Sequence, residues 1–358
     1  MAAMRSAVVG STRGSTDAAR PDARLGDARR VVAAPDKLRG TATAAEVAGA
    51  IARAAGAAGW ECDEVPMADG GEGTLEALGG ANRTSTVTGP LGEPVEAAWR
   101  LAGRTAVIEM ARASGLDLVG GAEGNDPVAA SSAGTGELIV EAIDKGAARI
   151  IVGLGGSATT DGGLAALRAL HPPGRLKGID LVVACDAMVR FLDAATLFGA
   201  QKGASPAQVE LLRRRLERLA QVYLVEHGVD VLGLAGAGAA GGLAGGLAAA
   251  GARLVSGFDL VAEEVALDEH LEDADLVITA EGFLDAQSFE GKVVGGVAAL
   301  AGALGVPAVA IAGQVFDRAE DRVDAVSLVD RFGVERARGD TLRCIEEVVG
   351  DVLARHEA

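Results

Sequence analysis

The chain has 358 residues, which is enough for two domains or one large domain, and it carries a formal charge of −17. This acidity argues against a general nucleic-acid surface, so an anionic substrate has to be met by a local group of Lys and Arg side chains. Only 3% of the residues are aromatic and 51 are glycine, which predicts an aliphatic core and many tight turns.

Neither the cysteines nor the apolar stretches indicate secretion or a membrane span. Cys62, Cys185 and Cys344 lie far apart in the sequence, which favours reduced thiols in the cytoplasm over a disulfide scaffold or a zinc site. The most apolar stretch, residues 232–252, is interrupted by glycines. Residues 1–29 mix Arg, Asp, Ser and Ala without a secretory apolar core, and we predict a disordered extension there.

The first ordered elements are predicted to be strands that end in charged, glycine-containing loops. A strand at 30–35 runs into Asp36, Lys37 and Arg39, and a helix follows from Thr43, where Glu46 completes a capping box. A second strand at 62–65 runs into a loop at 67–74 and then another helix. In α/β proteins, ligands lie at the carboxyl ends of strands arranged in this way.

Residues 84–109 alternate between polar and apolar types, with Gly-containing turns between the runs. This pattern predicts a small antiparallel meander and the entrance to a second domain. A helix is expected from Ser131 to about Lys145, with Leu138, Ile139 and Ile143 on one face.

A strand at 150–154 is followed by a small, flexible loop and a helix at 164–170. Backbone N–H groups at such a helix start can face an anion, and Gly155 and Gly156 let the backbone approach a phosphate. Three hydroxyl donors lie in the loop: Ser157, Thr159 and Thr160. Asp161 indicates a bound cation or an acid/base role, with a simple helix cap as the alternative.

The second half of the chain returns to the same strand and helix pattern. We predict strands at 181–186, 274–279, 306–312 and 323–329, a long helix at 206–225 and a closing helix at 340–355. The strand at 181–186 ends on Asp186, and that at 274–279 runs into a loop with Glu281 and Asp285.

The sequence at 236–241 matches the GxGxxG dinucleotide fingerprint through Gly236, Gly238 and Gly241, and Asp259 has suitable spacing. The segment before it is a poor strand, so a loop packed against a helix is the favoured interpretation. An NAD-dependent oxidoreductase is the alternative.

Charged side chains recur at the predicted strand ends. They are Asp36, Lys37, Arg39, Asp69, Glu72, Asp161, Asp186, Glu281, Asp285 and Lys292. Acids can hold Mg²⁺ or accept a hydroxyl proton, and cations neutralise phosphate oxygens, which together are the parts of phosphoryl transfer. The chain has no GxxxxGK[ST] motif, so this is not a P-loop enzyme.

Taken together, these motifs resemble the type I glycerate kinases, in the order found in that family. The matching segments are APD at 34–36 with Gly40, PMADGGEGT at 66–74, GPLGEPV at 89–95, ARASGL at 111–116, GTGEL at 134–138, GGSAT at 155–159 with DGG at 161–163, FG at 198–199 with QKGA at 201–204, GAGAAGG at 236–242, and EG at 281–282 with Asp285.

The resemblance implies ATP-dependent, Mg²⁺-dependent phosphorylation of D-glycerate, with 2-phosphoglycerate favoured over 3-phosphoglycerate. It implies an α/β fold of two domains with the active site in the cleft. One is a Rossmann-like parallel-sheet domain built from both chain ends (30–82 and 258–358), and the other is an inserted mixed α/β domain (83–257). We expect no nucleic-acid or membrane partner, and a homo-oligomer is compatible with this class.

The resemblance also implies roles for the charged residues. The loop at 155–163 would bind phosphate, while Lys37, Arg39 and Lys292 would bind the glycerate carboxylate or the transferring group. Asp161 or Asp186 would hold Mg²⁺ or accept the hydroxyl proton, and the sequence leaves that assignment open. The remaining candidates for binding substrate or nucleotide are Asp36, Asp69, Glu72, Glu281 and Asp285.

This chain departs from the family pattern at several positions. Arg39 stands where the family has Lys, Thr160 where it has Asn, and Phe283 where it has Arg. The segment between the helix at 164–170 and the strand at 181–186 is much shorter than in typical members, and residues 187–195 replace a usual Asn-Pro and Gly-Pro loop. These departures leave a second alternative, a non-catalytic sensor of a glycerate-like ligand.

Overall fold

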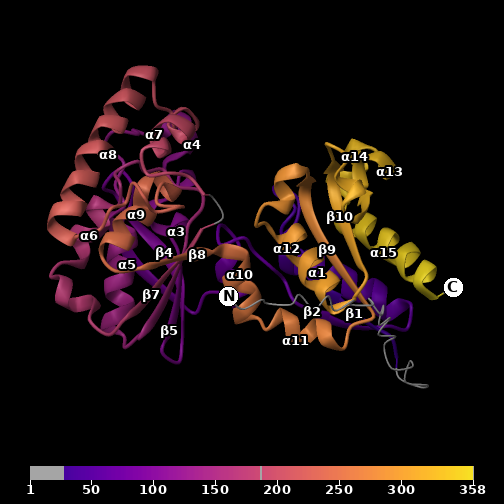
Figure 1. Ribbon diagram of the computed structural model, residues 1–358. Helices are drawn as coiled ribbons and strands as arrows, with labels where there is room; N and C mark the ends of the chain where they lie inside the picture. The colour runs from indigo at the N-terminus through magenta and orange to yellow at the C-terminus, as the bar shows by residue number, and fades with distance from the viewer. Residues whose placement is uncertain (1–27, 186–187, 358) are drawn as a thin grey trace, which may run out of the picture.

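The computed structural model describes residues 28–185 and 188–357, which form two β-sheets flanked by helices (Figure 1). The first sheet is wholly parallel, and both ends of the chain contribute to it. Its strands, in spatial order, are β11 (Asp324–Ser327), β10 (Ala308–Val315), β9 (Leu276–Leu284), β1 (Arg30–Ala33) and β2 (Glu61–Glu64). This arrangement confirms the predicted α/β fold with a parallel sheet built from both chain ends.

Helices cover both faces of the first sheet because side chains alternate between faces along each strand. Val31 and Ala33 face a core shared with α1 (Ala44–Ala57) and α15 (Thr341–Glu357). Val32 faces the opposite core, which contains residues of the helices α10 (Gly257–Glu264), α11 (Leu267–Glu272) and α12 (Val293–Leu304).

The second sheet is mixed and lies between the two chain segments that build the first. Its strands, in spatial order, are β3 (Arg83–Thr88), β4 (Pro94–Ala102), β5 (Thr105–Glu109), β6 (Arg149–Gly153), β7 (Asp180–Cys185) and β8 (Arg253–Ser256). The pairs β3–β4 and β4–β5 are antiparallel, and the remaining pairs are parallel. The predicted antiparallel meander is therefore present.

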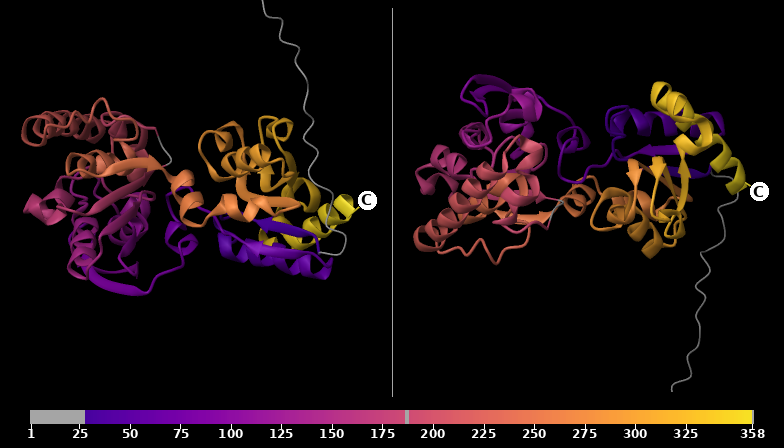
Figure 2. Two further views of the ribbon diagram at one scale, coloured as in Figure 1. Left: turned by 60° about the horizontal axis from the view of Figure 1, so that its bottom comes forward. Right: turned by 90° about the horizontal axis from the view of Figure 1, so that it is seen from above.

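One helix packs against both sheets. On one face of the second sheet, Ile150 and Val152 pack with residues of α5 (Ala133–Asp144), α6 (Leu164–Leu170) and α9 (Leu243–Ala249). On the other face, Ile151 packs with Leu75 of α2 (Thr74–Ala77) and with Leu260 of α10. Since α10 also contributes to the core of the first sheet, it joins the two halves, which lie side by side in all three views (Figures 1 and 2).

A separate helical layer stands beside the second sheet. It consists of α7 (Asp193–Phe198) and the long α8 (Pro206–His227), which pack around the buried Phe191 and Tyr223. The remaining helices are short: α3 (Ala111–Ser114), α4 (Gly121–Gly124), α13 (Leu328–Phe332), α14 (Val334–Gly339) and the 3-10 turns η1 (Asp117–Val119), η2 (Pro173–Leu176), η3 (Ala200–Lys202), η4 (Ala239–Gly242), η5 (Ala286–Phe289) and η6 (Ala319–Asp321).

The structure differs from the sequence-based expectation in three places. Strand β9 continues to Leu284, so Glu281 lies within a strand and not in the loop after it. The strand β8 was not predicted, because it has only four residues and lacks an alternating pattern, and the helices α10 and α11 were not predicted either. The helix α13 begins at Leu328, within the last predicted strand.

Two predictions concern residues outside the described part of the chain. The disordered extension at 1–29 falls almost wholly there, and so does Asp186. Within residues 28–185 and 188–357, no helix combines the length and apolarity needed to cross a membrane.

Candidate active site

The two sheets meet through loops at the carboxyl ends of their strands. A Cβ atom added to Gly155, just beyond β6, would lie 2.9 Å from the Cα of Gly71, just beyond β2. A Cβ on Gly153 would lie 2.8 Å from the carbonyl oxygen of Gly70. Only glycine allows the backbones to approach this closely, so the loop at 69–73 lies directly against the start of the loop at 155–163.

Glu109, the last residue of β5, fixes this contact. Its Oε1 accepts hydrogen bonds from the backbone N–H groups of Gly73 (2.8 Å) and Leu75 (2.9 Å), and its Oε2 lies 3.1 Å from Nε of Arg112. The carboxylate is buried and therefore depends on these partners. Glu109 thus anchors the loop at 69–73 to the second sheet, a role that its sequence context did not indicate.

The predicted residues Asp36 and Lys37 lie at the carboxyl end of β1, where they form an ion pair of 3.5 Å. The backbone N–H of Lys37 also donates to Asp36 Oδ1 at 2.7 Å. Burial raises the pKa of Asp36 to about 6, against the effect of Lys37 and with a further contribution from Asp69. A carboxyl group in this state exchanges its proton near neutral pH.

Lys37 is surrounded by acids. Burial alone would lower its pKa, but the carboxylates of Asp36, Asp69 and Glu72 outweigh burial and raise it. The exposed Arg39 lies near enough to oppose them. The structure therefore brings the predicted residues of the loops at 36–39 and 69–72 together around one ammonium group.

Glu281 extends this group of residues from the neighbouring strand β9. Burial raises its pKa to about 7, while the Ser288 hydroxyl and Lys292 oppose the shift and Asp36 adds to it. The backbone of Asp36 is also tied to β9, since its N–H donates to Ala280 O at 2.8 Å. Asp36, just after β1, and Lys292, at the start of α12, thus both act on Glu281 in β9.

Three further residues lie near the end of β9. Asp285 caps η5, where its Oδ1 accepts from the backbone N–H groups of Gln287 (2.8 Å) and Ser288 (3.2 Å). Lys292 occupies the N-cap position of α12. Phe283 points to solvent with 56% of its surface exposed, and its ring centroid lies 6.0 Å from that of Phe316.

A second group of residues lies in the loop after β6, where Ser157, Thr159 and Thr160 are buried. The Nζ of Lys202 donates to Ser157 Oγ and to the carbonyl of Thr159, each at 2.7 Å. Burial lowers the pKa of Lys202 to about 8, opposed by Asp161. The sequence analysis did not select Lys202 as a site residue, although it lies in the QKGA segment that carried part of the family resemblance.

Asp161 uses both carboxylate oxygens within the protein. Its Oδ2 accepts from the backbone N–H (3.0 Å) and the hydroxyl (2.8 Å) of Ser132, and its Oδ1 accepts from Gly163 N–H (3.0 Å). These bonds join the loop to the start of α5, whereas α6, the helix that follows the loop, has no side-chain cap. The carboxylate accepts three hydrogen bonds and keeps a lone pair on Oδ1 that a metal ion or a proton can use.

Several buried oxygens at the two groups lack a hydrogen-bond partner within the described residues. They are the hydroxyl oxygens of Thr159, Thr160 and Thr279, and Oε1 of Glu281. Buried polar atoms of this kind are costly unless a ligand or water satisfies them. Gly156 is exposed and has a φ of +61°, so its backbone is accessible beside the hydroxyls. This loop fits a phosphate-bearing ligand.

Mg²⁺ fits the chemistry of this site, since acids surround Lys37 and a phosphate-bound Mg²⁺ needs only one or two protein carboxylates. Within residues 28–185 and 188–357, no three His, Cys, Asp or Glu side chains converge into a complete metal site. A metal ion here would therefore depend on the phosphates for most of its ligands.

The loop containing the GxGxxG sequence supports the backbone of the second group. A Cβ on Gly241 would lie 1.8 Å from Thr159 O, and Gly162 N–H donates to Gly241 O at 3.0 Å. The described residues between the end of α8 and this motif form turns and contain no strand. The motif is therefore a close-packed loop, as the favoured interpretation held, and lacks the βαβ context of a dinucleotide site.

The comparisons with known proteins identify the family of this chain. A family model described as "Glycerate kinase family" matches in two stretches, residues 31–172 and 171–353. The "Glycerate 2-kinase" of Escherichia coli K12 is 41% identical over 346 residues, covering 86% of this chain and 89% of that protein. The "Glycerate kinase" of Bacillus subtilis 168 is 39% identical, covering 80% and 85% of the two chains.

A solved structure leads to the same family. The crystal structure of a protein described as glycerate kinase 2, from Salmonella typhimurium LT2, superposes with a TM-score of 0.79 at 36% identity. It covers 92% of this chain, and 99% of that chain is matched. The chain therefore belongs to the glycerate kinase family.

Proposed function

We propose that this protein transfers the γ-phosphoryl group of ATP to D-glycerate and that 2-phosphoglycerate is the favoured product. The observation that carries the proposal is the meeting of two unlike groups of residues across the Gly71–Gly155 contact. One contains acids around Lys37, suited to binding and deprotonating a hydroxy acid. The other is a loop of buried hydroxyls beside Lys202, suited to phosphate.

We assign the phosphate-binding role to the loop at 155–163. Its exposed glycine backbone and the hydroxyls of Ser157, Thr159 and Thr160 would donate to phosphate oxygens. Lys202 holds Ser157 and the Thr159 carbonyl in place and adds a positive charge beside the loop. Asp161 keeps the loop attached to α5 through Ser132.

We assign proton transfer to Asp36. Its raised pKa of about 6 lets it lose a proton at neutral pH and take one from a bound hydroxyl group. Lys37, Arg39 and Lys292 would bind the glycerate carboxylate or the transferring phosphoryl group. Burial and the neighbouring Asp69 raise the pKa of Asp36, and Asp36 in turn raises that of Glu281.

Mg²⁺ would supply charge neutralisation on the ATP phosphates when bound. We keep Asp186 as the proposed protein ligand and add Asp69 and Glu72, which lie in the loop facing Lys37. Asp161 is the weaker candidate, because its oxygens already accept three hydrogen bonds.

We also propose that the domain boundaries follow the two sheets, with residues 30–82 and 258–358 in one domain and 83–257 in the other. Since α10 packs against both sheets, a boundary near its first residue would allow it to act as a hinge. The three cysteines lie far apart in the sequence, which favours reduced thiols, and we therefore propose that the protein acts in the cytoplasm.

An ADP-release assay with purified protein, ATP, Mg²⁺ and D-glycerate tests the proposal. We expect turnover with D-glycerate, and nuclear magnetic resonance of the product should show the phosphate on the second carbon. Binding of glycerate without turnover across a panel of hydroxy acids would support the sensor alternative. A hydroxy-acid-dependent change in NADH absorbance would support the oxidoreductase.

A further inference from the structure

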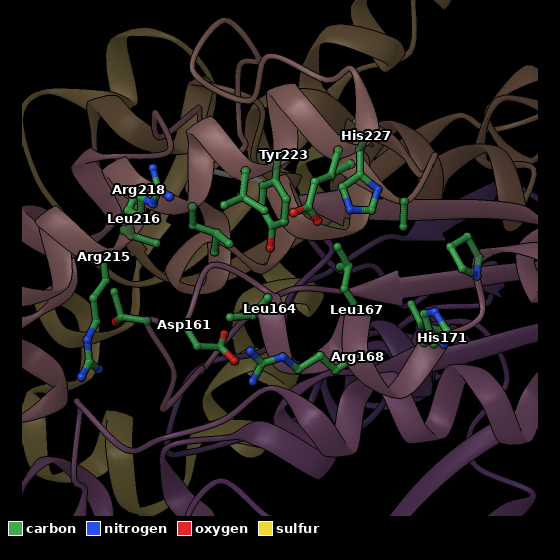
Figure 3. A pocket seen from close by; sticks show the side chains of 18 of the residues that line it. Asp161, Leu164, Leu167, Arg168, His171, Arg215, Leu216, Arg218, Tyr223 and His227 are labelled. Carbon is green, nitrogen blue, oxygen red and sulfur yellow. The ribbon is translucent and has the colours of Figure 1, made fainter.

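A large cavity lies between α6 and α8 and borders the candidate active site only at its edge (Figure 3). Its volume is about 1180 Å³, larger than most small-molecule pockets. The floor is apolar and half-buried, with Leu164 and Leu167 from α6 and Leu211 and Val222 from α8. It touches the loop at 155–163 only through Thr160 and Asp161.

The apolar residues of α8 recur at helical spacing along this groove. The lining residues of α8 extend from Leu211 to His227, which at 1.5 Å per residue gives a length of about 24 Å. Leu216, Leu219 and Tyr223 of α8 complete the apolar lining between Leu211 and His227. A stripe of this length matches about four turns of a second helix.

Arginines line the rim of the groove. Arg168 comes from α6, and Arg214, Arg215 and Arg218 come from α8, all with exposed side chains. Only two acids, Asp161 and Glu226, line the same cavity. In a chain of net charge −17, this is a local positive surface, which favours an acidic occupant.

The edge of this groove coincides with the junction between the two stretches that match the family model. The two matches to the family model meet at residues 171–172, and His171, Pro173 and Leu176 line the cavity. The connection from α6 to β7 contains only one short 3-10 turn, η2. A short connection therefore forms this edge of the groove.

We propose that this groove is a docking surface for an acidic, amphipathic helix of a partner protein. The apolar face of the helix lies on the leucine floor, and its carboxylates pair with the arginine rim. A second copy of this chain is disfavoured, because a symmetric contact would place the two arginine rims against each other. The proposal does not depend on the kinase activity.

A fluorescein-labelled peptide of 16 residues tests the proposal by fluorescence anisotropy. It carries Leu at every third and fourth position and Glu on the flanks. We expect saturable 1:1 binding to the full chain that weakens with salt, because screening acts on exposed ion pairs. A peptide with Lys in place of Glu, and one with the same composition in scrambled order, should bind at least tenfold more weakly.

Protein variants locate the binding site. Arg218→Glu at the exposed rim and Leu167→Asp on the floor should each weaken binding at least tenfold. Arg343→Glu makes the same charge change at an exposed position of α15, far from the groove in sequence, and should weaken peptide binding less than twofold. Circular dichroism checks that each variant is folded. If Leu167→Asp does not fold, Arg218→Glu alone tests the site.

Three results would overturn the proposal. One is equal binding of the acidic, basic and scrambled peptides. Another is binding that Arg218→Glu leaves unchanged. The third is a concentration-dependent dimer that Arg218→Glu abolishes, since the occupant would then be a second copy of the chain.

Discussion

The ammonium group of Lys202 lies 2.7 Å from the hydroxyl oxygen of Ser157, deep in the loop proposed to bind phosphate. Its second acceptor, the carbonyl of Thr159, lies at the same distance. These bonds hold a positive charge beside buried hydroxyls that lack other partners in the described residues. The loop is therefore arranged for an anion before any ligand binds.

The first prediction removes this charge. Lys202→Met should lower kcat/KM for ATP at least tenfold, because the loop loses a cation and Ser157 loses the donor that orients it. The ADP-release assay measures this effect. Lys177→Met, which replaces an exposed lysine after η2, is the matched control and should change kcat/KM less than twofold. Equal activity of the two variants would exclude Lys202 from the site.

The second prediction concerns the anchor between the two sheets. Glu109→Gln removes the charge from a buried group that holds Gly73, Leu75 and Arg112, and should lower the free energy of unfolding by about 1–3 kcal/mol. Glu76→Gln removes an exposed partner of the same arginine and should cost less than about 1 kcal/mol. Urea unfolding compares the two variants, and similar losses would show that Glu109 is not the anchor.

The sequence predicted the fold well wherever local signals were strong. Thr43 and Glu46 form the expected capping box at the start of α1, and alternating residues place β1 between two cores. Asp36 and Lys37 could be selected because strand ends in α/β folds converge on one edge.

The parts that the sequence did not reveal depend on contacts between distant segments. Lys202 ends the 3-10 turn η3 and lies 45 positions from Ser157, so the QKGA motif alone did not reveal its hydrogen bond to that residue. Glu109 looks like an ordinary strand end, because its hydrogen-bond acceptor role involves a loop 36 positions earlier. The hydrogen bond from Ser132 to Asp161 likewise joins residues 29 positions apart.

The third prediction tests the close approach of the two loops. Gly155→Ala places a Cβ 2.9 Å from Gly71 Cα, which forces the loops apart. We expect kcat/KM to fall at least tenfold, and the free energy of unfolding to fall by about 1–3 kcal/mol from overpacking. Gly282→Ala is the control, since its Cβ meets nothing nearer than 3.5 Å. If both variants keep full activity, the loops need not touch for catalysis.

The fourth prediction follows from the raised pKa of Glu281, about 7 in the folded protein against an ordinary value of 4.5. Between pH 4.5 and pH 7, Glu281 is protonated in the folded state but ionised in the unfolded state. The proton therefore stabilises the folded state fully below about pH 4.5, and this stabilisation is lost as the pH rises through about 7. Glu281→Gln cannot titrate. As the pH rises from 4.5 to 8, its free energy of unfolding should therefore increase relative to that of the natural protein by up to about 3 kcal/mol.

Urea unfolding of both proteins from pH 5 to pH 8 measures this difference. Asp36 titrates in both proteins, so its contribution largely cancels. Glu290→Gln, an exposed neighbour, serves as the control and should follow the natural protein at every pH. A difference between the natural protein and Glu281→Gln that does not change with pH would contradict the burial of this carboxyl group.

The fifth prediction assigns the proton acceptor. Because Asp36 has a pKa of about 6, kcat/KM for glycerate should rise with pH through this value as the carboxyl group loses its proton. Asp36→Asn should lack this rise and lose about 10²–10⁴-fold in kcat, with little change in KM, since general-base catalysis acts in the transition state. Asp324→Asn, on an exposed residue at the start of β11, is the control and should keep the natural profile. A loss of less than about threefold in kcat for Asp36→Asn would exclude Asp36 as the base and return the role to Asp186.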